Sequence, residues 1–77
     1  MPTFVNLPKP GMGTEEGTLL RWLKSVGDKV EQGETIAEVE FAKAMQEIES
    51  PVSGTLIKIL LPEGETARVN SDIAVIE

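Results

Sequence analysis

GTLLRWLKSVGDKVEQGETIAEVE, residues 17–40, and GTLIKILLPEGETARVNSDIAVIE, residues 54–77, are two copies of one pattern. They align without a gap at an offset of 37 residues. Gly33 faces Asn70, and both residue types accept a left-handed backbone turn. The matched pairs are Leu19 with Leu56, Ile36 with Ile73, Ala37 with Ala74, and Gly27 with Gly64. The chain therefore contains one supersecondary unit twice.

Each copy has the pattern of a strand, a turn, a short extended stretch, a second turn and a second strand. Residues 18–26 also fit an amphipathic helix, but their counterpart carries Pro62 in a run that favours strand. Residues 4–7 add a further strand, which Pro8 and Pro10 close. We predict an all-β fold of about eight short strands, a flattened barrel or sandwich of two small antiparallel sheets with internal pseudo-two-fold symmetry (a barrel-sandwich hybrid).

The composition narrows the classes of function. The chain of 77 residues has the size of one small domain, and it lacks both cysteine and histidine. It therefore has no disulfide, and it has neither the commonest general base nor the commonest metal ligand. A net charge of −6 disfavours binding to nucleic acid, because phosphate contacts need a basic surface. No apolar run is long enough to span a membrane, and no signal peptide is visible.

The link between the two copies, residues 41–53, contains the candidate site. Ile48 stands between two glutamates, which is the pattern of a half-buried strand. This strand pairs naturally with residues 36–40, so the intervening segment forms the turn of a hairpin. The turn has no glycine, which favours a type I turn over a primed one. It reads Phe41-Ala42-Lys43-Ala44, and it places Lys43 between small residues at the end of a sheet.

A series of short motifs extends over nearly the whole chain. They are Glu15-Glu16-Gly17-Thr18, Arg21-Trp22-Leu23-Lys24, Val26-Gly27-Asp28-Lys29-Val30, Glu38-Val39-Glu40, Lys43-Ala44, Glu47-Ile48-Glu49-Ser50-Pro51-Val52-Ser53-Gly54 and Ile73-Ala74-Val75-Ile76. With these motifs in this order and spacing, the chain resembles the lipoyl domain of the dihydrolipoyl acyltransferases in 2-oxo acid dehydrogenase complexes.

The resemblance implies a carrier domain without catalysis of its own, residues 1–77, at the N-terminus of a longer acyltransferase. Lipoate would be attached covalently to Lys43 and would move acyl groups and electrons between active sites, as in pyruvate dehydrogenase. The implied partners are a lipoylating enzyme, a 2-oxo acid decarboxylase/dehydrogenase component and dihydrolipoamide dehydrogenase. The implied location is the bacterial cytoplasm or, after processing, the mitochondrial matrix, with the bacterial cytoplasm favoured.

The resemblance also implies which residues partners recognise around Lys43. In the family the turn reads Asp-Lys-Ala after a threonine, whereas this chain has Phe41, Ala42 and Ala44 around the lysine. We expect an exposed turn at Phe41, Ala42 and Ala44 that partners recognise. We expect the change at Ala42 to slow reductive acylation more than lipoate attachment. The acidic pair Glu15 and Glu16 lies in a loop that contributes to partner recognition in the family.

Two other functions remain open. A biotinyl carrier shares the fold, although biotin attachment sites resemble Met-Lys-Met and this chain has Ala42-Lys43-Ala44. An unmodified scaffold module would have kept the fold and lost the arm, and Ala42 is its best support. A hydrolytic carboxylate pair, Glu34 with Glu38 or Glu47 with Glu49, is a weaker hypothesis because so small a domain offers little room for a pocket.

Overall fold

The structure is a computed structural model that describes residues 2–9, 15–42 and 44–77. Within these residues, eight strands pair, all of them antiparallel. They are β1 (Thr3–Asn6), β2 (Glu16–Trp22), β3 (Lys29–Val30), β4 (Thr35–Phe41), β5 (Ala44–Glu49), β6 (Gly54–Ile59), β7 (Thr66–Arg68) and β8 (Asp72–Ile76). The predicted all-β class is confirmed, and β2 replaces the helix that residues 18–26 could have formed. In the described ranges, no helix has the length and apolar character that crossing a membrane requires.

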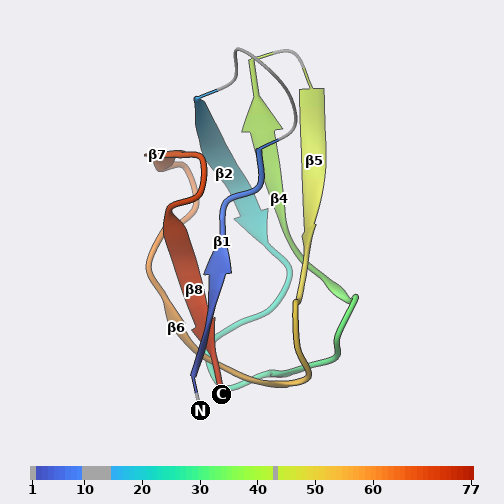
Figure 1. Ribbon diagram of the computed structural model, residues 1–77. Helices are drawn as coiled ribbons and strands as arrows, with labels where there is room; N and C mark the ends of the chain where they lie inside the picture. Colours follow the sequence, from blue (N-terminus) through green and yellow to red (C-terminus); the bar gives the residue numbers. More distant parts are fainter. Residues whose placement is uncertain (1, 10–14, 43) are drawn as a thin grey trace.

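The strands form two four-stranded sheets that face each other (Figure 1). One sheet has the order β1-β8-β6-β3, and the other has the order β5-β4-β2-β7. Each sheet takes strands from both copies of the repeat, because β2 pairs with β7 and β6 pairs with β3. Neither copy can therefore complete its sheet alone, and the two units interlock.

The pairing registers show that the two sheets are related by a pseudo-two-fold. Leu19 lies opposite Val39 between β2 and β4, and Leu56 lies opposite Ile76 between β6 and β8. A bulge follows at the same place in both strand pairs. The cross-unit hydrogen bonds match as well, because the Leu19 N–H donates to the Glu65 carbonyl and the Leu56 N–H donates to the Asp28 carbonyl, both at 2.9 Å.

The symmetry extends beyond the repeat that the sequence shows. In β1, Val5 lies opposite Ala74, and in β5, Ile48 lies opposite Ala37. Since Ala37 and Ala74 are matched positions of the repeat, β1 and β5 are counterparts. The sequence repeat does not show this equivalence, because the connection from β1 to β2 is longer than the connection from β5 to β6.

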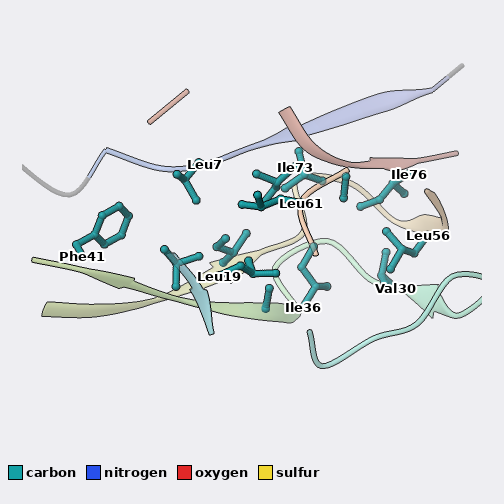
Figure 2. Packing of buried hydrophobic residues seen from close by; sticks show 14 residues of the cluster. Leu7, Leu19, Val30, Ile36, Phe41, Leu56, Leu61, Ile73 and Ile76 are labelled. Carbon is teal, nitrogen blue, oxygen red and sulfur yellow. The ribbon is translucent and has the colours of Figure 1, made fainter. Parts of the chain in front are cut away.

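The core lies between the two sheets and contains the matched positions that the repeat predicted to be buried. Leu19, Leu56, Ile36 and Ile73 have no exposed surface, and all four belong to one hydrophobic cluster (Figure 2). Burial of both members of each pair confirms that the two units contribute equivalent side chains. It also explains the strand pattern, because each sheet buries one face.

The turns are matched too. Gly33 has a φ of 87°, and its counterpart Asn70 has a φ of 67°. The Gly33 N–H donates to the Ser50 carbonyl, and the Asn70 N–H donates to the Leu7 carbonyl, both at 2.8 Å. Glycine and asparagine are the residues that accept this left-handed conformation most readily. Both positions thus adopt the left-handed turn that their residue types accept.

Candidate functional site

The candidate site is the tip of the hairpin formed by β4 and β5. The last pair of this hairpin is Phe41 with Ala44, so the connection consists of Ala42 and Lys43 alone. Lys43 itself lies outside the described residues. Figure 1 shows the tip at one end of the molecule, and the start of β1 and the end of β8 at the other. The predicted position of the hairpin is therefore confirmed.

The backbone of Ala42 excludes the turns that are commonest in two-residue hairpins. Among the described residues, Asn70 is the only non-glycine residue with a positive φ, so Ala42 does not have one. Types I′ and II′ both require a positive φ at the first loop residue. The expectation against a primed turn holds. An aspartate would meet no backbone strain at this position either.

The structure corrects the expected exposure of the turn at its first residue. Ala42 and Ala44 are exposed, as predicted, but Phe41 retains only 4% of its surface and belongs to the core. The physical reason is Gly17 in the neighbouring strand β2. A Cβ atom at Gly17 would lie only 2.7 Å from the Cε1 atom of Phe41, so the ring occupies the space that a side chain there would need. Phe41 therefore offers a partner almost no surface.

A surface hollow of about 390 Å³ adjoins the tip. Glu16, Glu40 and Ala42 are among the residues that line it. The hydroxyls of Thr18 and Thr66, which also line the hollow, are hydrogen bonded at 2.8 Å. The structure thus places Glu16 beside the tip. Glu15 is exposed and directly precedes β2, but it does not line the hollow. The proposed roles of both glutamates stay predictions.

The sequence interpretation missed several residues of this surface, among them Gly17 and Thr18 of β2. Glu40 and Thr66 line the hollow because β4 and β7 flank β2 on either side, with Glu40 and Thr66 both opposite Thr18. No local signal near Lys43 indicates Thr66, since only the strand order brings it there. Met45, next to Ala44, exposes 62% of its surface and lies opposite Glu40. An exposed methionine beside the tip offers an adaptable apolar contact to a partner.

Glu34 and Glu38, the first of the two candidate carboxylate pairs, each form an ion pair with a different cation. Glu34 is bound by the Lys24 ammonium at 3.0 Å, whereas Glu38 is bound by the Arg21 guanidinium at 2.8 Å. The hydrogen bond from Lys24 lowers the pKa of the Glu34 carboxyl, and a second hydrogen bond from the Glu31 N–H lowers it further. The two carboxylates are thus bound by separate cations. Such ion pairs are structural features of an exposed face.

The model of one protein family, described as "Biotin-requiring enzyme", matches residues 3–76. The dihydrolipoyllysine-residue acetyltransferase component of pyruvate dehydrogenase complex from Rickettsia bellii is 47% identical over 99% of the chain and 18% of that protein. The pyruvate dehydrogenase E1 component subunit beta from Rhizobium meliloti is 46% identical over 99% of the chain and 17% of that protein. The chain thus spans less than a fifth of the length of these relatives.

Two solved structures share the backbone fold. The urea carboxylase of Kluyveromyces lactis superposes with a TM-score of 0.84 at 23% identity, covering 100% of this chain and 6% of that one. The lipoyl domain of the 2-oxoglutarate dehydrogenase complex from Azotobacter vinelandii superposes with a TM-score of 0.74 at 23% identity, covering 95% of each chain. At this identity the likeness concerns the fold alone, and it confirms the predicted barrel-sandwich architecture.

Proposed function

This chain belongs to the family of biotin- and lipoyl-carrying domains, and on that premise we propose that it is a lipoyl carrier with the cofactor attached to Lys43. One observation supports this most strongly. The β4–β5 hairpin ends in a connection of Ala42 and Lys43 only, at the end of the molecule opposite β1's start and β8's end. The acetyltransferase names of its relatives favour lipoate over biotin.

The residues around the tip suit covalent attachment. A lysine amine with the ordinary pKa of about 10.4 is mostly protonated at neutral pH, so a ligating enzyme must surround and deprotonate it. Ala42 and Ala44 are small and exposed, which leaves room for such an enzyme on both sides of the lysine. The neutral amine nitrogen attacks the carbonyl carbon of an activated acyl group. An amide C–N bond forms, the activating group leaves with the bonding electrons, and the nitrogen loses a proton.

A carrier domain contributes position rather than catalysis. A bound lipoyl group supplies redox-active sulfur chemistry that accepts and hands on acyl groups and electrons. The domain raises the local concentration of that group at each active site in turn, because the group stays tethered. This task requires no acid, base or metal from the domain. It requires a projecting attachment point on a rigid support, which the two interlocked sheets provide.

The proposal extends to the larger protein and its partners. We expect residues 1–77 to be a carrier domain of a longer dihydrolipoamide acyltransferase. Its partners would be a lipoylating enzyme, a 2-oxo acid dehydrogenase component and dihydrolipoamide dehydrogenase. The names of the relatives favour a pyruvate dehydrogenase complex. The bacterial cytoplasm stays the predicted location.

Intact mass spectrometry of the protein from its native host tests the attachment. We expect one lipoyl group on the wild type and none on Lys43→Arg, because a guanidinium stays charged and cannot attack. Lys58→Arg, an equivalent exchange on an exposed position of β6, is the control and should keep the modification. A biotinyl mass would instead identify a biotin carrier. An unmodified wild type that a lipoylating enzyme also fails to modify would identify a scaffold module.

A further inference from the structure

Phe41 is the buried residue of the β4–β5 hairpin that lies nearest to Lys43 in the sequence. Glu40 and Ala42 on either side of it are exposed, whereas the Phe41 ring is buried. Figure 2 shows this ring at one end of the core, at the same end as Leu7, with Leu56 at the other end. Phe41 is also half of the last strand pair before the loop. One residue therefore connects the loop directly to the hydrophobic core.

The ring rests against Gly17 in β2. A Cβ atom at Gly17 would lie 2.7 Å from the Cε1 atom and 3.1 Å from the Cδ1 atom of Phe41, closer than the two side chains can pack. A ring at position 41 and a side chain at position 17 thus compete for the same space. Gly17 lies between Glu16 and Thr18, which line the hollow beside the tip, so the contact joins the tip to that wall of the hollow.

The described residues on either side of Lys43 cannot anchor this end of the hairpin through polar side chains. Ala42 and Ala44 have no polar side-chain atoms, so neither side chain can hydrogen-bond to the sheets. The buried Phe41 ring at the last strand pair supplies an apolar contact instead, and it ties this end of the hairpin to the core.

We propose that Phe41, seated on Gly17, is a positioning residue that holds the tip in the one conformation that the lipoylating enzyme binds. The inference rests on the proposed function and deepens it. When a binding-competent conformation is only partly populated, the apparent affinity falls by that fraction while the chemical step in the complex is unchanged. Loss of the ring should therefore raise KM for the domain and leave kcat nearly constant.

The test compares Phe41→Ala with Leu56→Ala, a core truncation at the opposite end of the cluster. For both variants we would measure thermal unfolding, amide hydrogen exchange at Ala44 and Met45, and kcat and KM for lipoylation by a purified lipoate–protein ligase. We expect Phe41→Ala to raise KM roughly tenfold, with kcat within about twofold, and to speed exchange at the tip. Leu56→Ala should lower the unfolding temperature similarly without either effect.

Phe41→Leu keeps an apolar side chain on Gly17 and serves as the rescue variant. Its KM should lie close to that of the wild type. If Phe41→Ala fails to fold, this variant still provides a KM to compare with the wild type. Equal KM values for Phe41→Ala and Leu56→Ala at matched stability would overturn the proposal, as would unchanged KM for both Phe41 variants. If the wild type were not lipoylated at all, the proposed function would fail. The exchange rates at Ala44 and Met45 would then still decide whether Phe41 fixes the tip.

Discussion

A methyl group added at Gly17 tests the packing beneath the tip most directly. The new Cβ atom of Gly17→Ala would lie 2.7 Å from the Phe41 ring and 2.9 Å from the Cγ1 atom of Val39, and both of these side chains are buried. Neither side chain can move away from the added atom into solvent without exposing its apolar surface to water. Overpacking of this kind typically costs about 1–3 kcal/mol. For a domain of this size, each kcal/mol lowers the unfolding temperature by roughly 4–8 °C.

A double-mutant cycle with Phe41→Leu assigns this cost to the ring. The smaller side chain vacates part of the space, so Gly17→Ala should cost less in the Phe41→Leu background, with a coupling of at least about 0.5 kcal/mol. Gly27→Ala is the matched control. Its φ of 98° strains any alanine, but nothing lies within 4 Å of the added atom, so its cost should be additive with Phe41→Leu. Urea unfolding measures the free energy of unfolding of each single and double variant, and the coupling follows from these values. A wild-type stability for Gly17→Ala, or a coupling of zero, would refute the packing argument.

Three further predictions follow from the surface and the core. Ala42→Asp should raise the rate of reductive acylation by a dehydrogenase adapted to an Asp-Lys-Ala turn and leave the lipoylation rate within about twofold, because the backbone there accepts aspartate without strain; a rescue of lipoylation instead would contradict this separation. Ile36→Val and Ile73→Val should each cost about 0.5–1.5 kcal/mol in urea unfolding, and nearly the same amount, because their sites are equivalent. Unequal costs would count against the symmetry. Glu34 has a lowered pKa in the folded state through Lys24, so its ion pair stabilises the fold at neutral pH and this contribution is lost as the pH falls through that pKa. Glu34→Gln should therefore lower the unfolding temperature slightly at neutral pH and not at a pH well below 4.5, and a difference that persisted in acid would exclude this ion pair as its cause.

The local pattern of the chain was enough to predict most of the fold. The repeat matched Leu19 with Leu56 and Gly33 with Asn70, and the structure gives both members of each pair the same burial or the same left-handed turn. Such features depend on a residue's own side chain and its immediate neighbours, so they can be predicted from sequence. The equivalence of β1 and β5 was missed from the sequence. The loop after β1 is longer than the loop after β5, so the two strands do not align at the offset of the repeat.

The sequence by itself placed Lys43 in the two-residue loop of a hairpin, because the strands on either side and the alanines beside it are local signals. Only the tertiary structure decided what surrounds that loop. Thr66 and Glu16 reach it through strand order. Phe41 was predicted to be exposed and is buried because a side chain is missing at Gly17, in a strand far away in sequence. Burial at a strand end depends on the space that another strand leaves open, and that space exists only once the strands have paired.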